Sequence, residues 1–326
     1  MNCPPVPVSV AVCTHGRPAQ LARALDSLLA QDREPQELLV IDNAPSDEAA
    51  REVVAVRGPR VRYIRERRPG LDFARNRAVA VATAPIIAFL DDDAVADRSW
   101  LGALAAAFGD PWVSACTGRV EALEIATPAQ RLFEANGGFA RGDRRIRLPA
   151  DAAGALHGWP APLVAWAVSV GSGCSMALRT ERARGLGGFD EALDLGPALP
   201  GGGDLDMLWR ILQSGGHVVY EPAALARHEH RRGLRETAAQ LAGHQRALVA
   251  WLTKAVAGTP GFERLPVLAF LAWRLAKPGV RLLRRAAHAD PLPAGWLWRM
   301  WWECWRGLFA YPAARATARQ RRLEAE

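Results

Sequence analysis

The sequence has 326 residues, 50% of them hydrophobic and 23% charged, which provides for a packed core and excludes global disorder. This length accommodates one large α/β domain with an appendage, or two modest domains. The five cysteines are scattered and odd in number, so we expect neither a disulfide framework nor a zinc site, and a reducing, cytoplasmic setting. We also expect no secretory signal, and no apolar run of about 18–20 residues that would span a bilayer.

The net charge of +7 is distributed unevenly along the chain. Residues 227–326 hold 18 basic and 7 acidic residues, a balance of +11, whereas residues 1–226 carry −4. Seven of the 12 tryptophans also follow residue 227. An acidic body with a basic, Trp-rich tail predicts two regions with different physical roles.

The first 120 residues alternate between strand and helix patterns. Apolar strand patterns fall at 8–12, 38–41, 61–64 and 86–90. Helix patterns lie between them, at 18–29, 47–56 and 71–81. This order predicts a mainly parallel sheet layered by helices, with the carboxyl ends of the strands at one edge.

The patterns after residue 90 are less regular. We expect helices at 99–108 and 205–212, and strands at 113–120, 168–178 and 217–220. Residues 121–165 have weak periodicity and mixed composition, and their pattern identifies no element.

Polar side chains follow three of the predicted strands: Thr14, Asp42 and the run Asp91-Asp92-Asp93. Ligands of open α/β sheets bind at the edge where such strands end. Three adjacent carboxylates repel one another unless a cation is present, and Mg²⁺ or Mn²⁺ is commonly held by carboxylates together with substrate phosphates. The alternative is that these residues are ordinary loop residues and the triple aspartate is a solvated turn.

The sequence resembles glycosyltransferase family 2 over roughly residues 6–230. The matching motifs are short, but their order along the chain is specific. They are VSVAVCTHGR at 8–17, LVIDN at 39–43, PGLDFARN at 69–76, FLDDD at 89–93, GGFDE at 187–191 and GDLD at 203–206. The resemblance implies a GT-A fold: a Rossmann-like, mixed, mostly parallel sheet flanked by helices. It divides the chain into a nucleotide-sugar half (1–120), an acceptor half (121–235) and a helical tail (236–326).

The resemblance also implies roles for single residues. Thr14 and Asp42 match positions that contact the nucleobase. Asp91 and Asp93 match the family's D-x-D motif, with Asp93 on the metal and Asp91 on the ribose or the metal. Asp92 is grouped with the substrate-binding residues.

Two further residues are candidates for the diphosphate region. Arg75 is a candidate phosphate contact, with a helix-surface arginine as the alternative. His228 is a candidate for the metal or the diphosphate, with a surface histidine as the alternative.

Asp204 matches the family's general base. A sugar hydroxyl is a poor nucleophile, and a positioned carboxylate can take its proton as it attacks. Asp204 also lies at a predicted helix N-terminus, where the helix dipole favours an anion, although a simple helix cap is the alternative. Asp206 is expected to be a supporting or substrate-binding carboxylate. The family often has glutamate before the base, and this chain has Gly203 there.

The tail contains an amphipathic helix pattern with an aromatic stripe at Trp298, Trp302, Trp305 and Phe309. Tryptophan beside arginine suits the headgroup region of an anionic membrane. The alternative is that this stripe packs on the catalytic body. The basic tail carries no nucleic-acid motif, and we expect no nucleic-acid partner.

The sequence thus predicts an inverting glycosyltransferase of cell-surface glycan synthesis. It would use a nucleoside-diphosphate sugar, a divalent metal and a glycan or lipid-linked acceptor, on the cytosolic face of a membrane. Two other classes remain open: a non-catalytic nucleotide-sugar-binding scaffold, and a metal-dependent nucleotidyltransferase. The absence of a G-x-x-x-x-G-K-[ST] motif argues against a P-loop enzyme.

Overall fold

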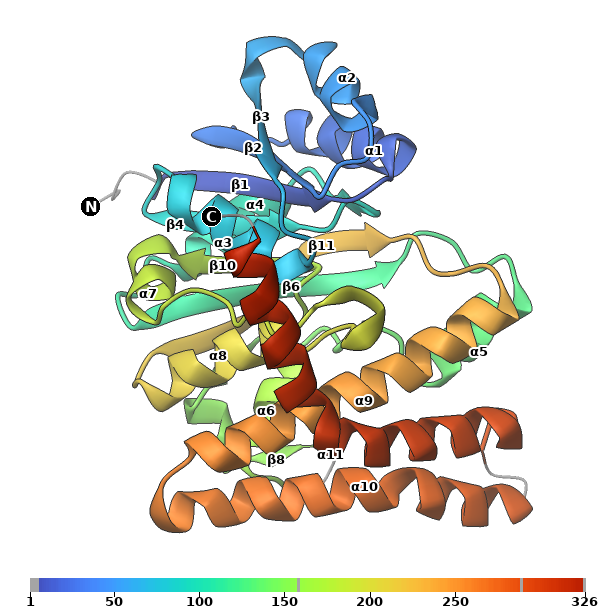
Figure 1. Cartoon of the computed structure of the whole chain (residues 1–326). Helices are drawn as coiled ribbons and strands as arrows, with labels where there is room; N and C mark the ends of the chain where they lie inside the picture. Colours follow the sequence, from blue (N-terminus) through green and yellow to red (C-terminus); the bar gives the residue numbers. More distant parts are fainter. Residues whose placement is uncertain (1–5, 157–158, 288–289, 325–326) are drawn as a thin grey trace.

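The computed structural model describes residues 6–156, 159–287 and 290–324, and shows a mixed sheet flanked by helices, with three long helices at the C-terminal end (Figure 1). The first five residues, which bear on the expectation of no secretory signal and include Cys3, lie outside the described part. The other four cysteines are free thiols.

The first half of the sheet is parallel, as its sequence pattern predicts. Its strands lie in the order β3-β2-β1-β4. Their bounds are β1 (Val8–Thr14), β2 (Glu37–Asn43), β3 (Val61–Glu66) and β4 (Ile86–Leu90). All three neighbouring pairs are parallel, so the four carboxyl ends lie at one edge.

The second half of the sheet continues from β4 in the order β10-β6-β11-β5, with β7 also paired to β11. These strands are β5 (Ala94–Ala96), β6 (Val113–Ala122), β7 (Ile146–Leu148), β10 (Ser175–Arg179) and β11 (His217–His228). Only β6 and β11 pair in parallel here, so the predicted parallel character is concentrated in the first half. A separate two-stranded sheet joins β8 (Ala155–Leu156) to β9 (Trp159–Pro160).

Helices cover both faces of the large sheet. They are α1 (Pro18–Leu29), α2 (Ala49–Ala55), α3 (Leu71–Val81), α4 (Trp100–Ala107), α5 (Pro128–Ala135), α6 (Leu163–Val170), α7 (Thr180–Gly185) and α8 (Gly203–Gln213). Short 3₁₀ turns lie at Gly58–Arg60, Ala150–Ala153, Gly196–Ala198 and Gly261–Glu263.

The predicted strand at 168–178 is wrong in its first half. Residues up to Val170 belong to helix α6, and the strand begins only at Ser175. The segment Leu163–Val170 is apolar and mostly buried. A short apolar run that is buried on several sides has no distinguishing period, so helix and strand cannot be separated from its pattern.

Two hydrophobic clusters lie on opposite faces of the sheet. In β1, Val10 and Val12 belong to one cluster, which also contains Leu21 of α1 and Trp100 of α4. Ala11, which lies between these two valines, belongs to the other cluster, because successive side chains of a strand point to opposite faces.

The tail consists of α9 (Leu234–Gly258), α10 (Arg264–Ala286) and α11 (Ala294–Leu323). Helix α9 joins the body's core through Trp251, which is fully buried in the same cluster as Ala11. Helix α10 and the first half of α11 form an outer layer beyond α9 (Figure 1). Within the described residues, none of the helices combines the length and the apolar composition that crossing a membrane requires.

The second half of α11 turns back across the body (Figure 1). Pro312 lies inside this helix, where proline removes a hydrogen bond and bends the axis. Tyr311 then donates to Asp190 Oδ2 at 2.6 Å, and Arg322 ion-pairs with Glu191. The C-terminal half of α11 is therefore tied to the body.

Candidate active site

The carboxyl ends of β1, β2 and β4 bring the predicted polar residues together. Thr14 and Asp42 are register partners on neighbouring strands. The Thr14 hydroxyl donates to Asp92 Oδ2 at 2.8 Å, which links the end of β1 to the segment after β4. This is the convergence that the sequence predicts.

Arg17, which the sequence analysis did not select, joins the same cluster. Its Nη1 donates to Asp92 Oδ1 at 3.0 Å and to Asp93 Oδ2 at 2.7 Å. Its position directly after the β1 strand end, in the THGR turn, is the signal that identifies it in retrospect. One arginine thus offsets part of the repulsion between two adjacent carboxylates.

Asp91, Asp93 and His228 form a candidate metal group. One ligand atom from each lies within 4.8 Å of the other two, and His228 Nε2 is 3.2 Å from Asp93 Oδ1. Burial, with repulsion from Asp93, raises the pKa of Asp91 to about 7. Burial would also raise the pKa of Asp93, but the hydrogen bond and charge of His228 outweigh it and lower that pKa. Two carboxylates and an imidazole fit a divalent cation. The positive charge of such an ion would also stabilise the ionised form of Asp91.

Two residues behind His228 fix its ring. His228 Nδ1 lies 3.0 Å from His230 Nδ1, and His230 Nε2 lies 2.6 Å from Glu134 Oε1 on α5. Such outer partners orient a metal-binding imidazole. Glu134 lies nearly one hundred residues away in sequence, in the weakly patterned segment, so no local pattern reveals it.

Asp42 is buried at the end of β2. It accepts a hydrogen bond from the Tyr63 hydroxyl of β3 at 2.7 Å. Burial raises the pKa of Asp42, and this hydrogen bond partly offsets the effect. Tyr63 was missed in the sequence analysis because it reads as an ordinary strand residue.

Asp204 lies in the first turn of α8, as predicted, and remains partly exposed. Gly202 before the helix has φ of 103°, a left-handed conformation that glycine adopts without strain. Gly173 N donates to Asp204 Oδ2 at 2.6 Å, and Leu205 N donates to Oδ1 at 2.8 Å. Cys174, which follows Gly173, accepts a hydrogen bond at its carbonyl from the backbone N–H of Asp91 at 3.1 Å.

Arg75 is buried beneath this arrangement and does not lie on a helix surface. Its Nη1 is 3.0 Å from Asp72 Oδ1 and 3.5 Å from Asp194 Oδ2. Burial would lower its pKa, but these carboxylates, with Asp91 and Asp204, raise it. Arg75 therefore supplies positive charge between the candidate metal group and Asp204.

Steric crowding explains why position 203 is a glycine and not a residue with a side chain. A Cβ atom on Gly203 would overlap the carboxylate of Asp72, which comes from α3 and is fully buried. The Gly203 N–H donates to Asp194 Oδ2 at 2.8 Å. Two carboxylates from other segments thus surround the place where a glutamate side chain would begin.

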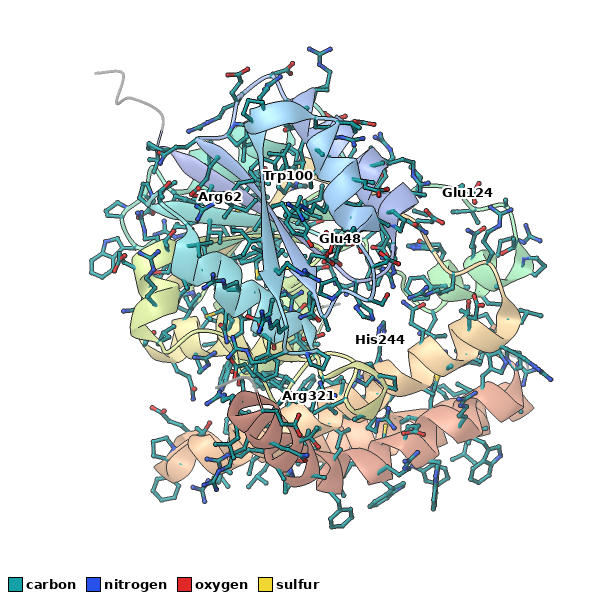
Figure 2. The ribbon with its side chains drawn as sticks, turned by 45° about the horizontal axis from the view of Figure 1, so that its top comes forward. Glu48, Arg62, Trp100, Glu124, His244 and Arg321 are labelled. Atoms are coloured by element: carbon teal, nitrogen blue, oxygen red, sulfur yellow. The ribbon has the colours of Figure 1, made fainter. Side chains whose placement is uncertain are left out.

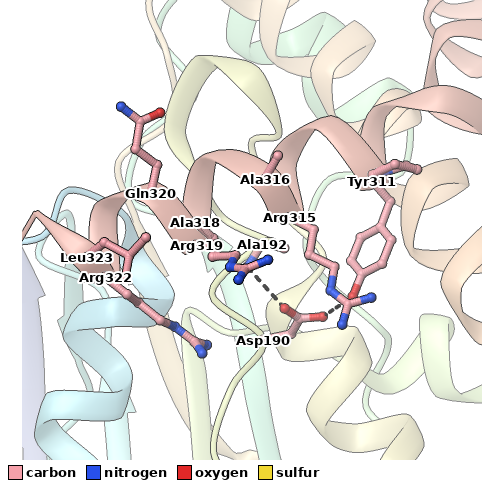
Figure 3. Close-up of a pocket in the computed structure, with 11 residues that line it drawn as sticks. Asp190, Ala192, Tyr311, Arg315, Ala316, Ala318, Arg319, Gln320, Arg322 and Leu323 are labelled. Atoms are coloured by element: carbon pink, nitrogen blue, oxygen red, sulfur yellow. Dashed lines mark hydrogen bonds between the residues drawn. The ribbon is translucent and has the colours of Figure 1, made fainter.

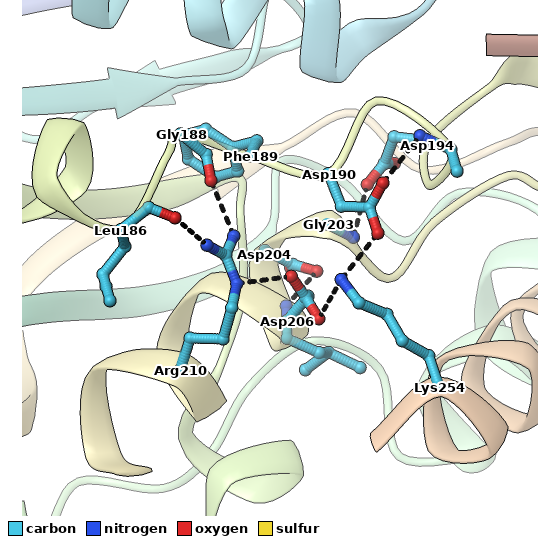
Figure 4. Close-up of polar contacts among 12 residues, drawn as sticks. Leu186, Gly188, Phe189, Asp190, Asp194, Gly203, Asp204, Asp206, Arg210 and Lys254 are labelled. Carbon is cyan, nitrogen blue, oxygen red and sulfur yellow. Dashed lines mark hydrogen bonds and ion pairs between the residues drawn. The ribbon is translucent and has the colours of Figure 1, made fainter. Parts of the chain in front are cut away.

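Asp206 has a different environment from Asp204 (Figure 4). It is buried, and its two oxygens ion-pair at 2.7 Å each with Arg210 Nε on α8 and with Lys254 Nζ on α9. Lys254 also contacts Asp190 Oδ2 at 2.6 Å. These contacts give Asp206 a role in joining helix α8 to the tail, and its predicted substrate contact stays a prediction.

A groove between α11 and the segment at 190–192 lies elsewhere on the surface (Figure 3). Arg315, Arg319 and Arg322 line it, and Tyr311 bonds to Asp190 at its end. None of the predicted site residues line this groove.

The sheet and its charged edge define a GT-A protein, and comparison with known proteins agrees. The model of Glycosyl transferase family 2 matches residues 9–151. This match covers less than half of the chain, and over these residues the chain is similar to that family.

Two curated relatives and one solved structure resemble the chain. A pre-mycofactocin glycosyltransferase of Mycobacterium tuberculosis is 32% identical over 170 residues, which are 52% of this chain and 32% of that relative. The succinoglycan biosynthesis protein ExoM of Rhizobium meliloti is 27% identical over 253 residues, covering 76% of this chain and 71% of the relative. The match thus spans about a third of the mycobacterial relative and most of ExoM.

The solved structure is the mannosyltransferase PcManGT from Pyrobaculum calidifontis, in complex with GDP-Man and Mn²⁺. It aligns with a TM-score of 0.60 and 21% identity, over 95% of this chain and 87% of that protein. This likeness shows that the two chains share the GT-A fold.

Proposed function

We propose that the protein is an inverting glycosyltransferase that moves a sugar from a nucleoside diphosphate to an acceptor hydroxyl, in cell-surface glycan synthesis. In this proposal residues 1–120 bind the donor and residues 121–235 bind the acceptor. Thr14 and Asp42 contact the nucleobase, Asp92 and Arg75 support the diphosphate, and Asp204 is the base.

One observation carries the proposal. Two consecutive residues contact the proposed base and the candidate metal group. Gly173 binds the carboxylate of Asp204, and Cys174 binds the backbone of Asp91. The base and the candidate metal group are therefore held next to each other by one short segment. A displacement at a sugar carbon needs this arrangement, because the base and the departing diphosphate act on the same small group.

Asp204 is oriented for proton transfer. Hydrogen bonds from Gly173 N and Leu205 N fix the carboxylate, and it remains partly exposed to an incoming hydroxyl. Asp204 lies in the first turn of α8, at the positive end of the helix dipole. As the acceptor oxygen attacks the anomeric carbon, Asp204 takes its proton and the bond to the diphosphate breaks, which inverts the configuration.

Asp91, Asp93 and His228 are the residues that would hold Mg²⁺ or Mn²⁺. When bound there, the ion would offset the charge that grows on the departing diphosphate. The solved neighbour, a Mn²⁺ complex, supports this assignment as an analogy of fold.

The test is product analysis with a panel of nucleotide sugars and either metal. We expect the wild type to release a nucleoside diphosphate from one donor, slowly to water and faster with an acceptor. Release of pyrophosphate would instead identify a nucleotidyltransferase. Binding of a donor without any turnover would identify a scaffold.

We further propose that the tail docks on an anionic membrane through a tail face composed of exposed residues. Its members are Leu265, Leu268 and Leu283 of α10 and Trp298, Trp302, Trp305 and Phe309 of α11. The four aromatic side chains are 47% to 77% exposed, so the alternative in which this stripe packs on the body does not hold. Exposed apolar area of this kind is rare on a protein with no partner.

The two helices present the tail face together. Trp301 of α11 donates its Nε1 to the carbonyl of Leu275 on α10 at 3.0 Å, and Gly279 packs against the same ring. Trp298 and Trp305 are three and four residues from Trp301, so they lie beside this seam. Exposed arginines flank the tail face at 264, 284, 299 and 306. Tryptophan with arginine suits an anionic headgroup layer.

Vesicle sedimentation tests the docking. The wild type should bind phosphatidylglycerol vesicles and release them at high salt, and should ignore phosphatidylcholine vesicles. A variant with Trp298, Trp302 and Trp305 changed to alanine should lose binding, whereas Trp112→Ala, an equally exposed tryptophan of the body, should keep it. Equal binding by both variants would refute docking through the tail face. The four free thiols support the cytosolic side as the location.

A further inference from the structure

Helix α9 forms a wall beside the proposed base. Pro200 packs against Gly243, and Gly202 packs against Ala247 and Trp251. These α9 positions recur at a helical spacing of four, so one side of α9 holds the loop that leads into Asp204. The tail therefore reaches the loop before Asp204 as well as the outer surface.

His244 comes directly after the first of these contact positions. Its side chain points from α9 into the space between this helix and the body (Figure 2). Its ring centroid lies 6.4 Å from that of Phe139, which in turn lies 5.0 Å from the ring of His228. The charges of Asp204 and His228 both act on His244, and burial lowers its pKa to about 4, so the ring is neutral at physiological pH. Among the described contacts, neither ring nitrogen has a hydrogen-bond partner.

Arg141, two residues after Phe139, completes the same wall. Its Nη1 donates to the carbonyls of Gly138 at 3.2 Å and Ala140 at 3.4 Å. Its Nε is buried and has no partner in the part of the chain that the structure describes. Burial lowers the pKa of Arg141, and the charges of Tyr220, Asp204 and Glu134 partly offset this effect. A buried donor of a charged group without a partner is costly, and a ligand oxygen would remove that cost.

We propose that Phe139, Arg141 and His244 line the acceptor subsite, and that Arg141 binds an oxyanion of the acceptor, a phosphate or a carboxylate. The inference rests on the proposed function, because Asp204 takes its proton from this acceptor. A guanidinium presents paired donors that match the oxygens of either anion. The neutral imidazole of His244 can donate to or accept from a sugar hydroxyl, and the Phe139 ring offers an apolar face.

Calorimetric titration with three probes in the presence of Mn²⁺ tests the subsite. Farnesyl phosphate represents a lipid phosphate, methyl glucuronide represents an acidic sugar, and methyl glucoside represents a neutral sugar. The wild type should bind one of the two anionic probes at least tenfold more tightly than methyl glucoside. The anionic probe that binds identifies the source of the oxyanion.

Variants separate a bound anion from a structural effect. Arg141→Met should weaken the anionic probe at least tenfold, and Arg141→Lys should weaken it less. His244→Gln, on a different element, should weaken binding of the same probe independently. Arg98→Met, an exposed arginine paired with Asp32, should bind like the wild type. If no anionic probe exceeds methyl glucoside, or if Arg141→Met binds as the wild type does, the inference is wrong. Donor cleavage to water by the wild type tests the proposed function separately, since it needs no acceptor.

Discussion

The strand-end edge of the sheet and the tail face are opposite in character, because the edge buries charged side chains and the tail face exposes apolar ones. At the edge, Asp93 pairs with Arg17 and Arg75 pairs with Asp72 in a largely buried setting, whereas burial and repulsion from Asp93 raise the pKa of Asp91. On the tail face, the apolar side chains of Trp302 and Phe309 are 65% and 77% exposed to solvent. Both arrangements cost free energy in the isolated chain. Each is therefore a place where the protein is prepared for something it binds.

The change with the largest expected effect is Asp204→Asn in the first turn of α8. It should lower the rate of sugar transfer by roughly 10²–10⁴-fold, because the amide cannot accept the acceptor's proton. Donor binding, measured by thermal protection, should persist. Asp32→Asn, an exposed aspartate far from the edge, is the matched control. A rate close to that of the wild type would remove Asp204 from the mechanism.

Gly203→Ala tests how tightly the edge is packed. The added methyl group would overlap the Asp72 carboxylate, so we expect a loss of about 1–3 kcal/mol in the free energy of unfolding by denaturant titration. Gly102→Ala in α4, where a Cβ meets open space, should instead gain ~0.5–1 kcal/mol from helix propensity. Equal stability of the two variants would show that Asp72 does not occupy this space.

Removing one link between the tail and the body should have a smaller effect. Tyr311→Phe deletes the hydrogen bond to Asp190, which keeps its ion pair with Lys254. We expect a loss of about 1 kcal/mol in the free energy of unfolding. A separate, earlier unfolding transition of the tail in calorimetry would contradict the close connection of the two regions.

The pH dependence of Mn²⁺ binding should report the raised pKa of Asp91. A folded-state pKa of about 7, against the ordinary 3.8 of an aspartate, means that protons compete with the ion below pH 7. The metal-free fold should lose stability as pH rises from about 4 to 7, and Mn²⁺ affinity should rise over this range and then level off. Affinity that does not change between pH 5.5 and 7.5 would contradict the prediction.

The sequence predicts the strand-end edge well because its signals are local. The apolar strand Ile86–Leu90 and the aspartates after it are adjacent in the chain, and the fold of parallel strands brings Thr14 and Asp42 to the same edge. Arg17 and Tyr63 escaped notice because their partners lie on other elements, and single residues without a pattern do not reveal such pairs.

The tail shows a different limit of sequence analysis. Helical spacing predicts the stripe that includes Trp302, but spacing alone does not distinguish an inward from an outward stripe. A second stripe on α11, with Leu297 and Cys304, is the one that is buried. The part that α9 plays at the cleft through His244 was not predicted, since it depends on how the tail packs.

The most direct test of the account is electron paramagnetic resonance of Mn²⁺ mixed with the wild type and with Asp93→Asn. The account predicts that the wild type removes the sharp six-line signal of free Mn²⁺ at one ion per chain, and that Asp93→Asn leaves that signal nearly unchanged. Asp32→Asn should behave as the wild type does. Equal removal of the signal by the wild type and Asp93→Asn would contradict the claim that the carboxylates at the sheet edge hold the ion.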